Sequence, residues 1–500
     1  MDHTVGQTTG QTLGQTADPT TGRQTGHGTA QTTGRPMGQA AVDLEHAARA
    51  TRELAAFVAG LRYEDLPEAV RERARWVFAD TVGVALRGSI EPEMQALYPR
   101  LPAGGGARLL KEGFPATDPA SAAWANAAAI SFLELDEGSR PTGHPALHVL
   151  PVTLAFAQAQ RASGRELLTA LVAGYEVQAR LQWATRLRWA VHPHGNFGHP
   201  AAVAAVGKLA GWDTEQLVHG ITAAASLATA TSWRPCLVGA TVRNAYAGTT
   251  AQVAMSVRLL VEAGFTGDPA ALAETFGNIL GEGFDPAALT DRLGQRFGIM
   301  ENYFKFHAAC ALTHPVLDAL AQALGATRQE GVYPPWSTPP RPAPAEVVRV
   351  RVRVLERFAR LAGPAQPNQL SAKFSIPYAV AAYLVTGQSA PASFTTAQAQ
   401  DPVVRALQDR VEVTGDPALT TRWPKEAPAE VTIELRDGRV LHGRCDNPFG
   451  SYAVPPGVDS LRAKFLALVG AVLPSQAAEK LWQQALAVDQ LEDMARFPAV

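Results

Sequence analysis

Cysteine is scarce in this chain of 500 residues, and its distribution argues against two common kinds of site. The three cysteines, Cys236, Cys310 and Cys445, are far apart and odd in number. A disulfide framework or a cysteine-ligated zinc site would need paired, regularly spaced cysteines. This usage is typical of a protein in a reducing compartment, so we expect a cytoplasmic location.

A strong excess of one charge is also missing, as are long apolar runs. The net charge is −2 and only 18% of the residues are charged, which leaves no basic footprint for nucleic acid or an anionic membrane surface. No stretch of 18 apolar residues is free of charged and turn residues, and the polar N-terminus lacks the apolar segment of a secretory signal. We therefore expect neither a membrane nor a nucleic acid as partner.

The sequence lacks the common phosphate-binding and zinc-protease motifs. No G-x-G-x-x-G follows a predicted strand and no G-x-x-x-x-G-K-S/T occurs, so nothing points to nucleotide binding. His192, His194 and His199 could ligate zinc, but Gly195 and Gly198 place them on a flexible loop, and no H-E-x-x-H spacing occurs. We expect no metal at these histidines.

The first 41 residues form a Thr/Gly/Gln-rich tract with a loose repeat, GQTTGQTLGQT followed by GRQTGHGTAQTTGRPMGQ. The tract has almost no bulky apolar side chains, so folding could not offset its loss of conformational entropy. We expect residues 1–41 to be a disordered leader.

From residue 42 to about residue 295, apolar residues recur at the three- and four-residue steps of helices. Several stretches are rich in Ala, Leu and Val nearly all round, as in helices buried inside a large all-α body. The expected helices include 118–135, 148–162, 164–188, 199–211, 213–230 and 242–263.

Between about 296 and 455 the pattern becomes that of an α+β domain. Residues 347–355 (VVRVRVRVL) alternate apolar and basic side chains, which predicts a half-exposed strand. Residues 431–435 and 440–442 flank an Asp-Gly turn, which predicts a hairpin and a sheet that is at least partly antiparallel. We therefore predict a mainly α fold, with a helical domain at 42–295, an inserted α+β domain at 296–455 and a helical return at 456–500 that packs on the first helices.

Eight of the twelve histidines lie between residues 144 and 314, mostly in three clusters at the ends of predicted helices. The first cluster, ELDEGSRPTGHPALHVL at 134–150, combines three acids, an arginine and two histidines. The second is HPHGNFGH at 192–199 and the third is KFHAACALTH at 305–314. Imidazoles beside carboxylates and cations suit acid–base chemistry on an anionic substrate.

Seven short motifs run through residues 43–497 in a recognisable order. They are FADTVG at 78–83, LD at 135–136 with GHP at 143–145, AGYEV at 173–177, HP at 192–193 with FG at 197–198, VRNAYAG at 242–248, KF at 305–306 with THP at 313–315, and AKFSIPY at 372–378. Together they resemble the MmgE/PrpD family, which includes 2-methylcitrate dehydratase, cis-aconitate decarboxylase and iminodisuccinate epimerase. No single motif would suffice, but chance does not explain their shared order and spacing.

The resemblance implies a helical domain plus an α+β lid, with the active site in the cleft between them. It also implies a homodimer that acts on a small di- or tricarboxylate without a metal or organic cofactor. Carried over residue by residue, Asp136, His144, His192 and Lys305 match positions that line the family's active site. We expect His144 and His192 to share the proton transfers, Asp136 to orient or tune one of them, and Lys305 to bind a carboxylate.

The expected substrate-binding residues are Arg243, Arg140, Tyr246 and Cys310. Arg243 stands where decarboxylase-type members carry a lysine, Tyr246 where a histidine often stands, and Cys310 where the decarboxylase has a histidine. An arginine keeps a carboxylate clamp but stays protonated, so a possible proton donor is lost. These departures count against decarboxylation and leave dehydration and epimerisation open.

The leading hypothesis is a lyase of the 2-methylcitrate dehydratase type, which dehydrates a hydroxy-polycarboxylate by histidine-mediated proton abstraction. An epimerase or isomerase of a small dicarboxylate would use the same site for the deprotonation step only. The alternative of another class is a protein that binds polycarboxylates without catalysis, in which His144 and His192 only cap loops before proline. The residues name neither the substrate nor which histidine is the base.

Overall fold

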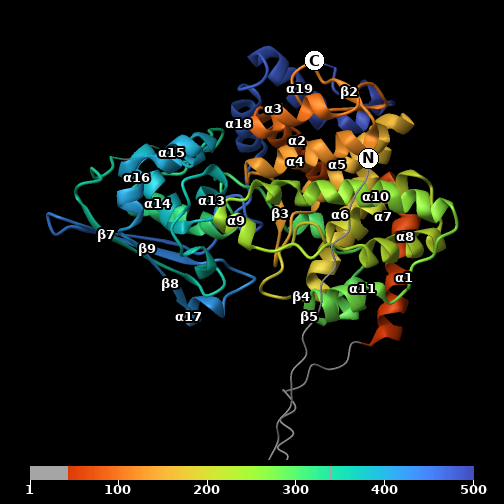
Figure 1. Cartoon of the computed structure of the whole chain (residues 1–500), viewed down its shortest axis with the longest axis horizontal. Helices are drawn as coiled ribbons and strands as arrows, with labels where there is room; N and C mark the ends of the chain where they lie inside the picture. The colour runs from red at the N-terminus through yellow and green to blue at the C-terminus, as the bar shows by residue number, and fades with distance from the viewer. Residues whose placement is uncertain (1–42, 338–339, 500) are drawn as a thin grey trace, which may run out of the picture. The chain divides into compact units, whose positions relative to one another are not determined.

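Helices dominate the computed structural model, which describes residues 43–337 and 340–499 (Figure 1). The predicted leader at 1–41 lies outside the described residues. Within those ranges no helix combines the length and the apolar character that crossing a membrane requires. A large helical part and a smaller α+β part are present, so the predicted fold class is confirmed.

The helical part is built around two buried helices, α5 (Pro145–Gln160) and α7 (Gly198–Leu209). Around them lie α1 (Leu44–Gly60), α2 (Glu68–Ser89), α4 (Pro119–Phe132), α6 (Gly164–Ala184), α8 (Thr214–Ser226) and α10 (Tyr246–Glu262). α5 packs on α4, α6 and α7, and α7 also packs on α8 and α10. Nearly all side chains of α5 and α7 are buried, as their apolar composition predicts.

Local sequence signals fix how some of these helices begin and meet. Ser163 and Glu166 form a capping box at the start of α6, which satisfies N–H groups that the helix itself cannot pair. Gly88 of α2 lies against α4, where an added Cβ would stand 1.9 Å from the carbonyl oxygen of Ala129. The close contact between α2 and α4 therefore requires glycine at this position.

Several predicted helices differ by a few residues from the observed ones, and two of them have a visible cause. The helix predicted at 164–188 ends at Ala184, because β4 (Thr185–Leu187) pairs antiparallel with β5 (Gly281–Phe284). The helix predicted at 242–263 begins with a 3₁₀ turn, Thr241–Ala245, before α10. In both places contacts from distant parts of the chain override the local helical pattern.

The C-terminal helices α18 (Val458–Val469) and α19 (Ser475–Leu486) pack against α2 (Figure 1). Lys464 of α18 is fully buried, and its ammonium donates to Asp80 Oδ1 at 2.7 Å and to the Leu135 carbonyl oxygen at 2.8 Å. The last segment thus contacts the first helices, as expected. The domain division at 42–295, 296–455 and 456–500 stays a prediction.

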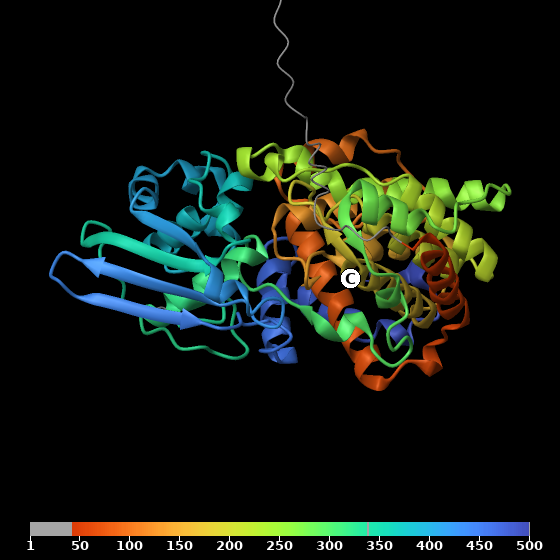
Figure 2. The ribbon, with the colours of Figure 1, turned by 90° about the horizontal axis from the view of Figure 1, so that it is seen from below.

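The α+β part contains a four-stranded sheet with the strand order β10-β9-β7-β8 (Figures 1 and 2). β7 pairs parallel with β8 and antiparallel with β9, and β9 pairs antiparallel with β10, so the predicted strand and hairpin are confirmed. Helix α12 (His314–Ala323) packs on β9 and β10, and α14 (Ile376–Thr386) packs on β8. The strands are β7 (Val347–Leu355), β8 (Val411–Asp416), β9 (Ala429–Leu435) and β10 (Val440–Cys445).

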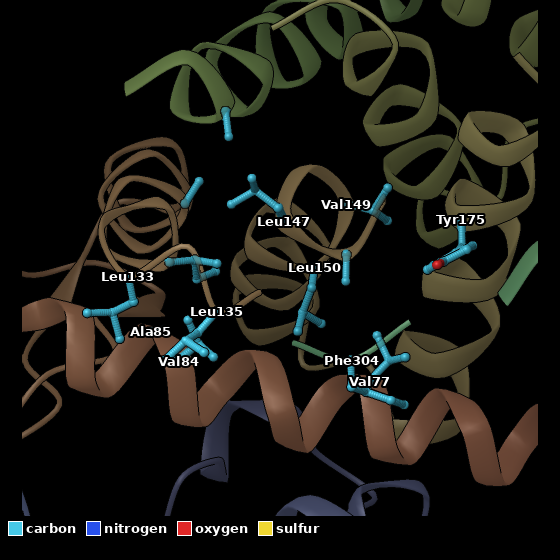
Figure 3. Packing of buried hydrophobic residues seen from close by; sticks show 14 of the residues in the cluster. Val77, Val84, Ala85, Leu133, Leu135, Leu147, Val149, Leu150, Tyr175 and Phe304 are labelled. Atoms are coloured by element: carbon cyan, nitrogen blue, oxygen red, sulfur yellow. The ribbon is translucent and has the colours of Figure 1, made fainter. Parts of the chain in front are cut away.

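The loop after α4 is anchored in the core that α2 and α5 share. Figure 3 shows Leu133 and Leu135 lying with Val84 of α2 in the same buried cluster. Glu134 between them adopts a left-handed conformation with φ 53°, which a non-glycine residue rarely holds. Because both leucines are buried in the core, the backbone fixes where the carboxylates of Glu134 and Asp136 lie.

Candidate active site

A short antiparallel pairing brings the first and third predicted clusters together. Strand β3 (Gly138–Ser139), in the loop after α4, pairs with β6 (Asn302–Tyr303). Lys305 follows β6 directly and is fully buried, as are its neighbours Phe304 and Phe306. The apolar neighbours that the sequence places around this lysine therefore mark an internal position.

Four buried side chains form a cluster of balanced charge: Glu134, Asp136, Arg243 and Lys305. The Glu134 carboxylate pairs with the Arg243 guanidinium and accepts a hydrogen bond from Lys305 Nζ at 3.0 Å. Lys305 Nζ also lies 3.7 Å from Asp136 Oδ1. Burial alone would lower the pKa of Lys305, but Glu134 and Asp136 outweigh it and raise that pKa. Lys305 is thus a fixed cation whose charge is already matched.

Asp136 contacts His144 at the edge of this cluster. His144 Nδ1 lies 2.7 Å from Asp136 Oδ2 and 2.9 Å from the Glu137 carbonyl oxygen. Two acceptors at one ring nitrogen require a proton on Nδ1, so in the neutral ring Nε2 carries a free lone pair. Burial alone would raise the pKa of Asp136, but Lys305 and His144 outweigh it and hold that pKa below its ordinary value. An ionised carboxylate therefore orients an imidazole whose Nε2 can accept a proton.

His192 has the opposite tautomer. Its Nδ1 accepts a hydrogen bond from the His194 backbone N–H at 3.1 Å, so in the neutral ring the proton is on Nε2. Burial and the nearby Arg243 charge lower the pKa of His192 well below its ordinary value. The indole of Trp233 packs against the ring at an interplanar angle of 50°, with 4.5 Å between centroids. His192 is therefore a neutral hydrogen-bond donor at physiological pH.

His194 fills the space between the two histidines. Its ring meets His144 and His192 edge to face, with centroid distances of 4.7 and 4.6 Å, and meets His148 at 5.2 Å. The His194 side chain is fully buried, and neither ring nitrogen has a hydrogen-bond partner among the described residues. Burial and Arg243 lower the pKa of His194 well below its ordinary value. A neutral imidazole here separates His144 from His192 and fixes their spacing.

Glu137 supports the same loop from behind. Its carboxylate accepts hydrogen bonds from the Ala146 backbone N–H at 2.8 Å and from the Tyr175 hydroxyl at 2.7 Å. Burial raises the pKa of Glu137 to about 7 despite these donors. Since the Glu137 carbonyl oxygen also contacts His144, a change in the charge of Glu137 acts next to the candidate base.

His144, His192 and Arg243 line a pocket of about 830 Å³, including its open mouth. We call it the central pocket. Glu134 is the only acid among the described residues that line it. Four arginines line it: Arg140, Arg243, Arg357 and Arg360. Seven aromatic side chains also line it: Trp233, Tyr303, Phe304, Phe358, Phe374, Trp423 and Phe449. This lining suits a polyanion with apolar parts.

The other predicted site residues have different places around the pocket. Arg140 and Cys310 line it, and burial raises the pKa of the Cys310 thiol to about 11, so this thiol stays protonated. Asp136 and Lys305 are not among the lining residues and lie buried behind Glu134 and His144. Tyr246 is not among them either, although its ring centroid lies 5.9 Å from that of His192.

The sequence reasoning missed several residues of this site. Glu134 was visible as one of three acids in the first cluster, but nothing local marked it as the partner of Arg243 and Lys305. Arg357 and Arg360 lie just beyond the strand predicted at 347–355, and nothing in the local pattern marked them as pocket residues. Among the described residues, no three or more His, Cys, Asp or Glu side chains are grouped to hold a metal ion.

Comparison with known proteins matches both halves of the chain. The model of the MmgE/PrpD N-terminal domain matches residues 52–285, and that of the MmgE/PrpD C-terminal domain matches residues 307–490. The chain is 26% identical over 466 residues to a cis-aconitate decarboxylase of Mus musculus, covering 89% of this chain and 91% of that protein. It is 25% identical over 459 residues to a cis-aconitate decarboxylase of Homo sapiens, covering 89% and 92%. It is 23% identical over 471 residues to a 2-methylcitrate dehydratase of Escherichia coli (strain K12), covering 87% and 93%.

Proposed function

The chain belongs to the MmgE/PrpD family, and from this premise we propose that it is a lyase of the 2-methylcitrate dehydratase type, which removes water from a hydroxy-polycarboxylate. The observation that carries the proposal is the pair of histidines with opposite tautomers on one pocket: His144 with a free Nε2 lone pair, and His192 with an Nε2 proton. Dehydration needs both, because one group must take a proton and another must assist the departing hydroxyl.

In the proposed reaction His144 acts as the base. Its Nε2 takes the proton from the carbon next to a substrate carboxylate, and the C–H electron pair becomes the second bond of the new alkene. The Asp136 carboxylate, 2.7 Å from Nδ1, stabilises the imidazolium that forms. The buried Lys305 keeps Asp136 ionised, so its role is to position and charge Asp136 rather than to touch the substrate.

His192 assists the other half of the reaction. As the C–O bond breaks, its Nε2–H donates a hydrogen bond to the departing hydroxyl oxygen. The low pKa of His192 makes it a hydrogen-bond donor and not a store for a second proton. The proton taken by His144 leaves with the hydroxyl group as water, so both rings return to their starting protonation states.

Decarboxylation is the second candidate, and the names of the relatives with the highest quoted identities favour it. Loss of carbon dioxide would leave a carbanion that needs a proton donor. Arg243 stays protonated, and the Cys310 thiol, with its raised pKa, is a weak acid. Neither residue is suited to give up a proton, which supports dehydration as the first choice.

Proton NMR in deuterated water tests the proposal. The panel is 2-methylcitrate, citrate, cis-aconitate, tartrate and aspartate-derived acids. New vinyl signals from a hydroxy acid are the expected result, and His144→Gln should lower the rate about 10²- to 10⁴-fold. His442→Gln, on the exposed strand β10, is the matched control and should leave the rate unchanged. Carbon dioxide release from cis-aconitate alone would favour the decarboxylase, and deuterium exchange without an alkene would favour the epimerase.

A further inference from the structure

Two arginines of the central pocket have neither an ion-pair partner nor a hydrogen-bond partner among the described residues. Arg357 follows β7 directly, and Arg360 lies in the 3₁₀ turn Ala359–Leu361. Neither guanidinium forms an ion pair or a hydrogen bond with any described residue. By contrast, Arg351 on the preceding strand pairs with Glu434 across the sheet. Arg351 on the sheet surface is thus paired, whereas Arg357 and Arg360, which line the pocket, are not.

Aromatic rings hold these two guanidinium groups in place. The Arg357 guanidinium carbon lies 4.6 Å from the Trp423 ring centroid, and that of Arg360 lies 4.5 Å from the Trp233 centroid. A guanidinium stacked on a ring keeps its N–H edges available for a planar, bidentate contact with a carboxylate. Burial lowers the pKa of Arg357, and burial together with Arg357 lowers that of Arg360 to about 10, so both stay cationic at neutral pH.

The other arginines of the pocket already have partners. Arg243 is matched by Glu134. Arg140 Nη1 donates to the carbonyl oxygens of Pro424 and Lys425 and to Asn447 Oδ1, each at 3.1 Å. Two half-buried positive charges close together therefore remain for a ligand, and an anion that bridges them would remove the cost of leaving them unpaired.

We propose that Arg357 and Arg360 form a carboxylate-binding subsite of the central pocket, which makes the substrate a tricarboxylate rather than a small dicarboxylate. This inference rests on the proposed function for the identity of the reacting end. Trp233 links the two ends, because its ring contacts both the Arg360 guanidinium and the His192 imidazole. A carboxylate bound by the arginine pair would therefore lie close to the indole that contacts His192.

Binding of unreactive ligands tests the subsite apart from catalysis. Propane-1,2,3-tricarboxylate has three carboxylates but no hydroxyl, and glutarate lacks the central carboxylate. Calorimetry on the unaltered full-length protein should give an affinity for the tricarboxylate at least about tenfold above that for glutarate. Equal affinities would overturn the proposal, whatever the variants do.

Variants then assign the preference to residues. Arg360→Gln and Arg357→Gln should each lower the affinity for the tricarboxylate about 10- to 100-fold while changing that for glutarate less than about threefold. Arg351→Gln, on the preceding strand β7 and paired on the surface, should change neither affinity. Equal losses for both ligands, or no loss in a variant with an unchanged circular dichroism spectrum and melting temperature, would overturn the subsite. If the binding preference holds but no hydroxy acid is turned over, the proposed dehydration fails and the subsite stands.

Discussion

Asp136→Asn separates the electrostatic role of Asp136 from the orientation of His144. The amide has nearly the shape of the carboxylate but carries no charge. His144 Nδ1 keeps a second acceptor, the Glu137 carbonyl oxygen at 2.9 Å, so the reactive tautomer survives the change. What is lost is the charge that stabilises the imidazolium in the proposed proton abstraction.

The expected loss can be bounded from the contact itself. A hydrogen bond to a charged group contributes about 1.5–3 kcal/mol, which corresponds to about 10- to 150-fold in rate. We therefore expect kcat to fall about 10²-fold, clearly less than in His144→Gln, with KM changed only a few fold. The same change leaves Arg243 and Lys305 facing Glu134 alone, so stability should fall by about 3–5 kcal/mol, as when one partner of a buried ion pair is removed.

The assay is steady-state kinetics on the substrate that the NMR panel identifies, combined with urea unfolding. Glu166→Gln, which alters a carboxylate at an exposed helix start, is the matched control and should leave kcat unchanged. A kcat for Asp136→Asn within threefold of the unaltered protein would refute the assignment of His144 as a base stabilised by Asp136. So would a loss as large as that of His144→Gln, because orientation would then depend on Asp136 alone.

Two further predictions concern stability. Burial raises the pKa of Glu137 to about 7 from an ordinary value of 4.5. Between these pH values the Glu137 carboxyl is protonated in the folded protein but ionised in the unfolded chain. The free energy of unfolding should therefore fall on the order of 3 kcal/mol as the pH rises through this window. Glu137→Gln should remove this fall in unfolding experiments from pH 4.5 to 8, and an unchanged pH profile would show that Glu137 is ionised throughout. Gly88→Ala should destabilise the protein by about 1–3 kcal/mol, because its Cβ would meet the Ala129 carbonyl, whereas Gly60→Ala, with open space around it, should be neutral or slightly stabilising. Equal melting temperatures for these two variants would contradict the close contact between α2 and α4.

Local sequence patterns were enough to predict the helical part, the strand at 347–355, the hairpin and the family resemblance. These features depend on local periodicity, on turn chemistry such as the Asp-Gly turn, and on the order of short motifs. The three histidine clusters were also visible, because the candidate catalytic side chains lie at helix ends and beside glycine or proline. Where a helix end depended on a distant strand, as at 185–187 with 281–284, the local pattern extended it too far.

The tertiary structure alone decided how the charges are matched. Glu134, Arg243 and Lys305 are far apart in sequence, and only the packing of the segments after α4, before α10 and after β6 brings their charged atoms into contact. That packing places Lys305 behind the pocket wall and leaves Arg357 and Arg360 without partners. The sequence alone does not show which of these charged side chains are paired. The tautomers of His144 and His192 follow from the same cause, because the fold places two acceptors at Nδ1 of His144 and a backbone donor at Nδ1 of His192.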